Sequence, residues 1–339
     1  MTTEIPLIEL RELEKYYTKR VWPQKGQVLR AVDGVSVTIR KGETLGLVGE
    51  SGCGKSTLGQ ITARLLEPTG GGLFYKGKDI SGSGSRKQQD LRRRIQYVFQ
   101  DPFTSLNPRF KIGRLLEEPL KLNRLGKAES RWSKVNDMLE SIGLDESYWN
   151  RYAHELSGGQ RQRIGIARAL MLSPEFLVLD EPVSALDVSV QAQVLNLLKD
   201  LQQELSLTYL FISHDLNVVH YMSDRVAVMY LGKIVEIGEM EEVYSHPLHP
   251  YTQALVSSIP AERAAQKRER IVLQGDLPDP SAIPSGCAFR TRCMHAHDRC
   301  FSEVPALADV REGHAVSCHL WSEDRYSANV IREVRTASL

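Results

Sequence analysis

A glycine-rich segment that follows an apolar stretch constrains the fold of this chain more than any other feature. Residues 49–56 are Gly-Glu-Ser-Gly-Cys-Gly-Lys-Ser, which fits the pattern G-x-x-x-x-G-K-[ST]. The preceding apolar run, Thr44–Gly49, is typical of a buried strand. Glycines allow backbone N–H groups to point at phosphate oxygens, and a helix that begins near Lys55 adds its positive N-terminal dipole. The segment therefore predicts a strand, a phosphate-binding loop and a helix.

The residues of this loop have separate predicted tasks. Lys55 is expected to reach the β- and γ-phosphates of a nucleoside triphosphate, and the Ser56 hydroxyl is expected to hold Mg²⁺. Cys53 is interpreted as a small loop residue without a redox role. The predicted nucleotide-binding residues of this segment are Gly49, Ser51, Gly52, Cys53, Gly54, Lys55, Ser56 and Thr57.

An acidic pair at the end of a second apolar run supplies the other half of such a site. A strand predicted at Phe176–Asp180 carries Asp180 to its C-terminal end, where a carboxylate can hold the magnesium shell. Glu181 follows directly and is placed to orient or deprotonate an attacking water. The alternative is that the acidic pair caps the turn at Pro182, an interpretation that the phosphate-binding loop weakens.

Alternating strands and helices predict an α/β core with a largely parallel sheet. Besides the two strands above, strands are expected at Leu29–Arg40, Ile95–Phe99, Tyr209–Ser213, Arg225–Tyr230 and Lys233–Ile237, and a helix at Val190–Leu205. Apolar residues recur at helical spacing in residues 101–157, which predicts a mostly helical insert. We expect a nucleotide-binding domain over residues 1–245, β-rich at its N-terminal end, and a C-terminal extension over residues 246–339.

Composition narrows the class of protein. The 339 residues include 43 Lys and Arg against 42 Asp and Glu, and 42% of the chain is apolar, the balance of a folded soluble protein. This balance excludes a disordered chain and a basic nucleic-acid tail. No run approaches the roughly 18–20 apolar residues of a membrane helix. The N-terminus also lacks the pattern of a secretory signal, so the expected compartment is the cytosol.

A third motif is Leu156-Ser-Gly-Gly-Gln160, which precedes the basic helical segment Arg161–Arg168. Serine and glycine before a helix leave backbone N–H groups exposed and form a second anion site. With this motif placed before Phe176–Glu181, the chain resembles the ATPase subunits of ABC transporters, for which LSGGQ is the signature. The resemblance implies a P-loop NTPase fold of the ABC type that binds ATP with Mg²⁺ and hydrolyses ATP to ADP and phosphate.

The resemblance also implies roles for residues that match the family's motifs in order. Gln100 resembles the Q-loop glutamine, Ser184–Asp187 the D-loop, and His214 the switch histidine that touches the γ-phosphate. Tyr17, or the neighbouring Tyr16, resembles the aromatic residue that lies against adenine. The implied catalytic residues are Glu181, His214 and Gln100, and the implied magnesium site is formed by Ser56, Gln100 and Asp180. The signature residues Ser157, Gly158, Gly159 and Gln160 would close on the γ-phosphate from a facing subunit.

The C-terminal part resembles a narrower group of these ATPases. Residues 246–255, 275–280 and 284–293 are similar to the tail of oligopeptide and dipeptide importer ATPases, most closely the second ATPase of dipeptide-type importers. The resemblance implies a paralogous ATPase, two transmembrane permease subunits and a periplasmic or extracellular substrate-binding protein as partners, and no nucleic acid. It implies a peripheral location at the cytoplasmic face of the membrane, with a groove for a permease coupling helix in the insert around residues 103–152.

Four cysteines lie in this extension with the spacing C-x5-C-x6-C-x17-C, at Cys287, Cys293, Cys300 and Cys318. Clustered thiols in a cytosolic chain favour a metal site over disulfides. The spacing matches neither the usual zinc pairs nor the common ferredoxin patterns, so the residues alone leave the metal open. The resemblance favours a [4Fe–4S] cluster, with zinc as the second candidate and unliganded thiols as the third. Nearby histidines that could replace a ligand are His295, His297, His314 and His319.

Two other functions compete with peptide import. A soluble ABC ATPase that acts on ribosomes or DNA generally carries two cassettes or a long coiled-coil insert, whereas this chain has one copy of each motif. A regulatory iron–sulfur protein with a vestigial ATPase conflicts with the intact Glu181 and His214. The transported solute is not encoded, because the related importers handle dipeptides, oligopeptides, glutathione, nickel or haem-like compounds.

Overall fold

The computed structural model describes residues 5–19, 27–82, 87–101, 106–259 and 270–321. In these residues the larger sheet has eight strands in the order β11-β12-β10-β9-β3-β8-β7-β6. The strands are β3 (Thr44–Val48), β6 (Ile95–Val98), β7 (Phe176–Asp180), β8 (Thr208–Ser213), β9 (Arg225–Tyr230), β10 (Lys233–Glu239), β11 (Ala308–Arg311) and β12 (His314–Val316).

The centre of this sheet is parallel, as the sequence predicts. Strand β3 pairs in parallel with β8 and β9, and β7 pairs in parallel with β6 and β8. Every residue of β3, β7 and β8 is buried, which explains why these strands have continuous apolar sequences without alternation. The carboxyl ends of parallel neighbours meet at one edge of the sheet, and the candidate site lies at this edge.

A smaller antiparallel sheet, in the order β2-β1-β4-β5, covers helix α1 (Lys55–Thr62) from the other side. Its strands are β1 (Ile8–Lys19), β2 (Gln27–Ile39), β4 (Gly70–Tyr75) and β5 (Lys78–Asp79). The alternation predicted for β2 is seen as alternating burial in its second half. The apolar face of this sheet shares a core with α1 and the larger sheet, in which Leu13, Val35, Leu58 and Leu210 are buried.

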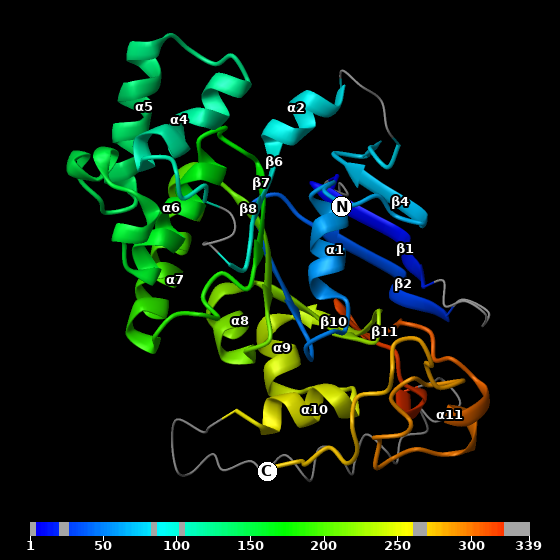
Figure 1. Ribbon diagram of the computed structural model, residues 1–339. Helices are drawn as coiled ribbons and strands as arrows, with labels where there is room; N and C mark the ends of the chain where they lie inside the picture. Colours follow the sequence, from blue (N-terminus) through cyan, green and yellow to red (C-terminus); the bar gives the residue numbers. More distant parts are fainter. Residues whose placement is uncertain (1–4, 20–26, 83–86, 102–105, 260–269, 322–339) are drawn as a thin grey trace.

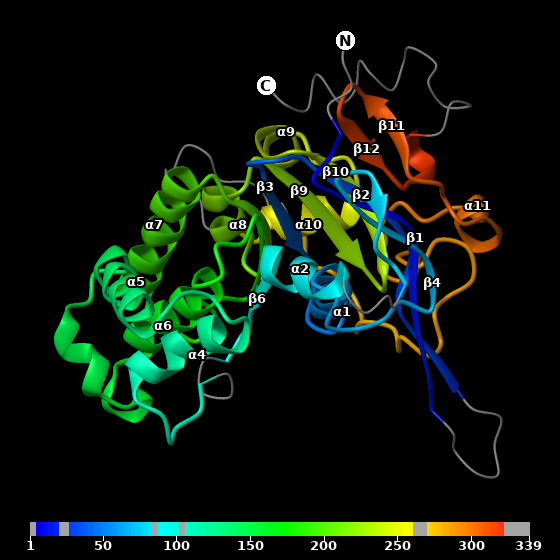
Figure 2. The same cartoon turned by 90° about the horizontal axis from the view of Figure 1, so that it is seen from above.

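The predicted helical insert forms a group of helices at one side of the molecule, away from the C-terminal extension (Figures 1 and 2). It contains α4 (Ile112–Leu122), α5 (Ala128–Ser141) and the short helices η1 (Glu146–Asn150) and η2 (Ala153–Glu155). Helix α6 (Gly158–Leu170) begins just after the predicted C-terminal bound, residue 157, and packs against these helices. The insert has its own apolar core, which includes Leu115, Leu139 and Ile164. Leu122 belongs to the same predicted stripe but is 73% exposed at the end of α4. Phe103, where the expected groove begins, lies outside the described residues.

The remaining helices complete the two faces of the larger sheet and the extension. They are α2 (Lys87–Arg94), α7 (Val188–Leu205), α8 (Leu216–Met222), α9 (Met240–Ser245), α10 (Pro250–Ser257), α11 (Asp298–Ser302) and the short η4 (His319–Trp321). The prediction of a helix at Val190–Leu205 is confirmed by α7. None of the described helices has the length and apolar character needed to cross a membrane.

The C-terminal extension is built onto the core sheet. Strand β12 pairs with β10 and thereby adds two strands, β12 and β11, to the larger sheet. The carboxylate of Glu236, fully buried on β10, accepts hydrogen bonds from the backbone N–H groups of Leu248 and His249, both at 2.8 Å. His314 Nε2, on β12, lies 2.7 Å from the same carboxylate. The extension therefore meets the core through polar as well as apolar contacts.

A cluster of aromatic rings provides the apolar part of this contact. The ring of Phe289 lies 5.3 Å from that of Tyr230, 5.5 Å from that of Tyr251 and 5.4 Å from that of His249, measured between centroids. Phe289 is buried, and tilted or edge-on ring pairs at such distances add to the stabilisation that burial provides. Phe289 is therefore an apolar anchor of the extension.

We expect Phe289→Ala to destabilise the junction of the extension and the core by about 3–5 kcal/mol, because a large ring is removed from a packed cluster. Urea unfolding of the purified chain, followed by tyrosine fluorescence, measures the loss. The matched control is Phe301→Ala, since Phe301 is 56% exposed in the same extension and its removal leaves no cavity. Equal stability of the two variants would contradict the anchoring role of Phe289.

Candidate functional site

The phosphate-binding loop connects β3 to α1 as predicted. Gly54 caps α1 with φ +111°, and a Cβ at this position would lie 2.0 Å from the carbonyl oxygen of Ala31, so only glycine fits. The Lys55 ammonium is buried against the loop and donates hydrogen bonds to the carbonyl oxygens of Gly49, at 2.7 Å, and Glu50, at 3.0 Å. The loop thus presents a helix N-terminus and a lysine together, the arrangement that binds phosphate groups.

Two of the three predicted magnesium residues, Ser56 and Asp180, meet beside this loop. The Ser56 hydroxyl donates a hydrogen bond of 3.0 Å to one carboxylate oxygen of Asp180, and the hydroxyl of Tyr97 donates one of 2.6 Å to the other. Burial raises the pKa of Asp180, the two hydrogen bonds oppose the shift, and the charge of Glu181 adds to it. The sequence does not predict this role for Tyr97. The one feature that connects Tyr97 with the site is its position on β6, three residues before Gln100.

The three predicted catalytic side chains converge at the ends of adjacent strands. Gln100 follows β6, Glu181 follows β7 and His214 follows β8. The Gln100 amide donates a hydrogen bond of 2.8 Å to Glu181 Oε2, and His214 Nδ1 lies 3.3 Å from the same oxygen. Glu181 adopts φ +46°, a conformation that is costly for a residue with a side chain and is common at functional sites.

These groups open into a cavity of about 460 Å³ that has the size expected of a ligand site. The cavity is lined by Tyr17, Leu29, Ala31, Ser51, Gly52, Gly54, Lys55, Ser56, Thr57, Gln100, Glu181, His214 and Pro280. Two predicted loop residues do not line it. Cys53 is buried in the core beneath the loop, and Gly49 lies where the loop leaves β3.

The two tyrosines proposed for contact with adenine are placed differently. Tyr17 lines the cavity and is 41% exposed. The hydroxyl of Tyr16 instead donates a hydrogen bond of 2.6 Å to Asp33, and burial together with this carboxylate raises its pKa. Tyr17 is therefore the better placed of the two, and Pro280, from the C-terminal extension, is a lining residue that the sequence did not indicate.

The signature residues lie apart from this cavity. Ser157 caps α6, where its hydroxyl accepts a hydrogen bond from the Gln160 N–H at 3.3 Å, and the Gln160 side chain accepts one from the Ser157 N–H at 3.0 Å. A Cβ on Gly159 would lie 2.3 Å from a methyl group of Val190, so this glycine permits close contact between α6 and α7. Within one chain, the structure does not bring the signature to the phosphate-binding loop.

Comparison with known proteins assigns the family. The pattern of the ABC transporter family matches residues 32–184, and that of the oligopeptide/dipeptide transporter C-terminal region matches residues 235–300. The oligopeptide transport ATP-binding protein AppF of Bacillus subtilis is 53% identical over 321 residues, which cover 93% of this chain and 98% of the relative. This chain belongs to the ATP-binding subunits of ABC transporters.

Further relatives agree with this family assignment. The dipeptide transport ATP-binding protein DppF of Haemophilus influenzae is 50% identical over 94% of this chain and 99% of the relative. Among solved structures, cbiO1 of Clostridium perfringens, part of an ABC transporter complex, is 30% identical with a TM-score of 0.62, over 72% of this chain and 92% of its own. A dimeric ATP-binding cassette bound to ADP and phosphate is 29% identical with a TM-score of 0.61, over 69% and 98%. The predicted ABC ATPase fold is thereby confirmed.

The four cysteines of the ABC subunit's extension are free thiols that lie near one another. The N–H of Cys287 donates a hydrogen bond of 2.9 Å to the carbonyl oxygen of Cys300. Burial raises the pKa of Cys318 to about 12, and the charges of the other three thiols contribute to the shift. Within the described ranges, however, no group of three or more His, Cys, Asp or Glu side chains is arranged to hold a metal ion. The predicted metal-binding extension therefore stays a prediction.

The neighbouring histidines have other contacts. His314 lies against Glu236, and His319 Nε2 lies 3.0 Å from the carbonyl oxygen of Glu303. His297 Nδ1 lies 3.4 Å from Cys300 Sγ and 3.2 Å from the carbonyl oxygen of His295. Among these contacts, that of His297 reaches a cysteine sulfur.

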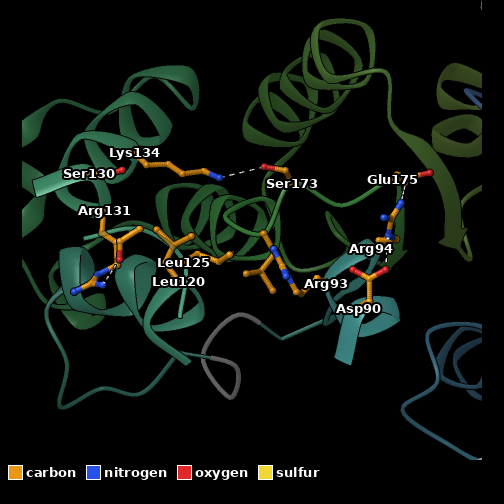
Figure 3. A pocket seen from close by; sticks show the side chains of 12 residues that line it. Asp90, Arg93, Arg94, Leu120, Leu125, Ser130, Arg131, Lys134, Ser173 and Glu175 are labelled. Atoms are coloured by element: carbon orange, nitrogen blue, oxygen red, sulfur yellow. Dashed lines mark hydrogen bonds and ion pairs between the residues drawn. The ribbon is translucent and has the colours of Figure 1, made fainter. Parts of the chain in front are cut away.

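Another cavity, of about 510 Å³, lies between α2 and α5 and is distinct from the nucleotide site (Figure 3). Its walls carry several cations, but the Arg94 guanidinium is paired with Glu175 and Asp90. Lys134 donates a hydrogen bond of 3.1 Å to the Ser173 hydroxyl. None of the residues predicted to bind nucleotide or metal lines this cavity.

We expect Tyr97→Phe to weaken Mg²⁺ binding about fivefold, because loss of one neutral hydrogen bond raises the pKa of Asp180 further and leaves its carboxylate less well held. Titration of Mg²⁺ in an ATP-binding assay measures the change. Tyr16→Phe is the matched control, since it removes a hydroxyl from Asp33 and keeps the ring. Unaltered Mg²⁺ affinity in Tyr97→Phe would show that this hydroxyl does not support the metal site.

Proposed function

We propose that this ABC subunit hydrolyses ATP to drive the import of dipeptides or oligopeptides. The observation that carries the proposal is the convergence of Lys55, Glu181 and His214 on one cavity at a phosphate-binding loop. Asp180 lies next to this cavity, hydrogen-bonded to the lining residue Ser56. The extension supports the peptide class, because its pattern is that of oligopeptide/dipeptide transporters. The same match weighs against a soluble ABC ATPase that acts on ribosomes or DNA.

The proposed roles follow from the geometry. Lys55 and the N–H groups at the start of α1 would bind the phosphates, and Tyr17 would lie against the adenine ring. Ser56, Asp180 and Gln100 would hold Mg²⁺, which neutralises phosphate charge when bound. Glu181 would accept a proton from the attacking water or orient it, since its carboxylate is held by Gln100 and His214. Most of the rate enhancement would then come from positioning and electrostatic stabilisation.

A facing subunit would complete the site. The Ser157–Gln160 signature lies apart from its own phosphate-binding loop, and it forms the N-terminus of α6, whose positive dipole end suits a γ-phosphate. The dimeric cassette solved with ADP and phosphate supports such an arrangement. We infer that the partner is a paralogous ATPase and that nucleotide binding favours the closed dimer.

The transporter would further contain two permease subunits and a substrate-binding protein, with this subunit at the cytoplasmic face of the membrane. A groove of about 550 Å³ between β6, α4, α6 and the turn that follows α1 suits a short permease helix. Its lining includes the exposed apolar side chains of Leu65, Phe99 and Leu122, and Phe99 directly precedes Gln100 in the chain. Through this groove, movement of the permease would be transmitted to the catalytic residues.

We further propose that the chain has two parts: residues 1–245 form the ATPase domain, and residues 246–339 form the C-terminal extension.

The four cysteines are proposed to hold a [4Fe–4S] cluster, with zinc as the alternative. Four sulfur donors suit either metal chemically. The electrostatic influence of Cys287, Cys293 and Cys300 on Cys318 shows that the four thiols are neighbours, which supports a shared metal. The resemblance of the extension to that of oligopeptide and dipeptide transporters favours the cluster over zinc. When bound, the cluster would organise the extension, and no catalytic step is assigned to it.

We expect Glu181→Gln to retain ATP binding and to lower the hydrolysis rate about 100-fold or more, because an amide cannot accept the proton of water. The measurements are ATPase activity and uptake of labelled di- and oligopeptides by vesicles that contain the full transporter. Glu241→Gln, at an exposed carboxylate beside His220, is the control. Undiminished hydrolysis in Glu181→Gln would refute the assignment, and uptake of non-peptide solutes alone would refute the substrate class.

We expect anaerobically purified protein to contain iron and acid-labile sulfide, and Cys300→Ser to lose both, because a hydroxyl is a poor ligand for iron. Elemental analysis and the visible absorption spectrum measure this. Cys53→Ser is the matched control, since Cys53 belongs to the phosphate-binding loop and should not affect metal content. Colourless protein with one equivalent of zinc would refute the cluster.

A further inference from the structure

Glu50, the second residue of the phosphate-binding loop, is held by the C-terminal extension. Both of its carboxylate oxygens accept hydrogen bonds from Arg292 Nη1, at 2.9 and 3.0 Å. Its backbone N–H donates a hydrogen bond of 2.8 Å to the hydroxyl of Tyr251, on α10. Its carbonyl oxygen accepts the 3.0 Å hydrogen bond from Lys55 Nζ. Every polar group of this one residue is therefore fixed, and two of them are fixed by residues that lie more than two hundred positions away.

The pair formed by Arg292 and Glu50 is shielded from water. The Arg292 side chain is only 9% exposed and that of Glu50 27%. Such a pair is screened less by salt than a surface ion pair, and removal of one partner leaves the other charge uncompensated. Tyr251, which holds the backbone of Glu50, is fully buried and belongs to the aromatic cluster around Phe289. The contact of Glu50 with Arg292 and Tyr251 is therefore part of the buried packing between the extension and the core.

Arg292 reaches the loop because the extension is anchored on both sides of it. The Arg292 N–H donates a hydrogen bond of 3.0 Å to the carbonyl oxygen of Phe289, and Cys293, the next residue, packs against the same core cluster as Phe289. The extension touches the nucleotide site a second time through Pro280, which lines the cavity. Residues from two parts of the extension therefore lie at the site where the nucleotide is expected.

We propose that Arg292 is a positioning residue for ATP binding, acting through Glu50 on the phosphate-binding loop. The proposal rests on the binding of ATP at this loop. Two physical effects support it. Arg292 neutralises a carboxylate that would otherwise repel the anionic triphosphate, and it fixes the residue whose carbonyl oxygen orients Lys55. Because coupling between two sites is reciprocal, a bound nucleotide should in turn stabilise the extension around Arg292.

The first test compares the affinity of the purified full-length chain for a fluorescent ATP analogue across variants of the pair. We expect Arg292→Gln to weaken binding about tenfold, within the usual range of coupling between sites. Arg292→Lys should restore part of the affinity, because it retains the charge. Glu50→Gln removes the repulsion, so the double variant Arg292→Gln/Glu50→Gln should bind ATP more tightly than Arg292→Gln alone.

The matched control is Arg290→Gln. Arg290 lies in the same turn, but its guanidinium lies over the ring of Phe301, 5.2 Å from the centroid, within the extension itself. Thermal unfolding of each nucleotide-free variant separates loss of fold from loss of affinity. If Arg292→Gln does not fold, Arg292→Lys and Glu50→Gln test the same contact from its two ends.

The second test measures the reverse direction of the coupling. Hydrogen exchange in residues 286–300 should slow when Mg²⁺ and nucleotide bind to the unmodified chain, and this protection should be lost in Arg292→Gln at saturating nucleotide. A purely structural role for Arg292 would not make exchange in the extension depend on nucleotide.

The outcomes separate this inference from the proposed function. If the unmodified chain binds nucleotide and Lys55→Ala does not, the phosphate-binding loop acts as proposed. Equal affinity of Arg292→Gln and the unmodified chain then overturns the role of Arg292 alone, as does exchange in residues 286–300 that does not respond to nucleotide. If the unmodified chain binds no nucleotide, the proposed function fails and this inference fails with it.

Discussion

The register of four parallel strands is the constraint on which the rest of the structure depends. Val98 pairs with Leu179 across β6 and β7, Asp180 with Ile212 across β7 and β8, and Val48 with Ser213 across β3 and β8. These pairs align the C-terminal ends of β3, β6, β7 and β8 at the same edge of the sheet. A shift by one residue in any strand would turn its side chains to the opposite face and move its catalytic group away from the others. The fully buried apolar side chains of β3, β7 and β8 hold this register.

Charge is organised locally in this protein. The chain has a net charge of only +1, so its overall charge contributes little attraction for the anionic nucleotide. Attraction must come from a lysine, a helix N-terminus and backbone N–H groups gathered at one loop. Such a site is sensitive to single nearby carboxylates. Glu50, Asp180 and Glu181 all lie at or beside the loop, and each has a hydrogen-bonding partner that limits its effect.

Much of the ATPase core could be predicted from the sequence, because its signals are local. Continuous apolar runs predict β3, β7 and β8, and the motifs that follow them predict the residues of the cavity. Tyr97 could not be predicted, since nothing in a four-residue strand indicates which side chain meets Asp180. The pairing of β12 with β10 also gave no signal, because β12 has only three residues and carries no readable periodicity.

Contacts between distant parts of the chain were the least predictable. The pattern of the extension resembled a known group, but resemblance did not indicate where the extension touches the core. Arg292 and Glu50 lie 242 residues apart, and no sequence motif indicates that the two side chains are in contact. Pro280 in the nucleotide cavity is a similar case. Only the folded arrangement shows that the extension borders the site.

The strands that the extension adds to the larger sheet also determine how that sheet ends. Strand β10, with seven residues, would otherwise present a row of unpaired backbone groups, and an exposed edge of this kind can recruit another chain. With β12 and β11 in place, the edge strand of the sheet is β11, which has four residues and carries Asp309 and Arg311. A short, charged border strand is a poor template for further pairing. The extension therefore also shields the sheet from edge-to-edge aggregation.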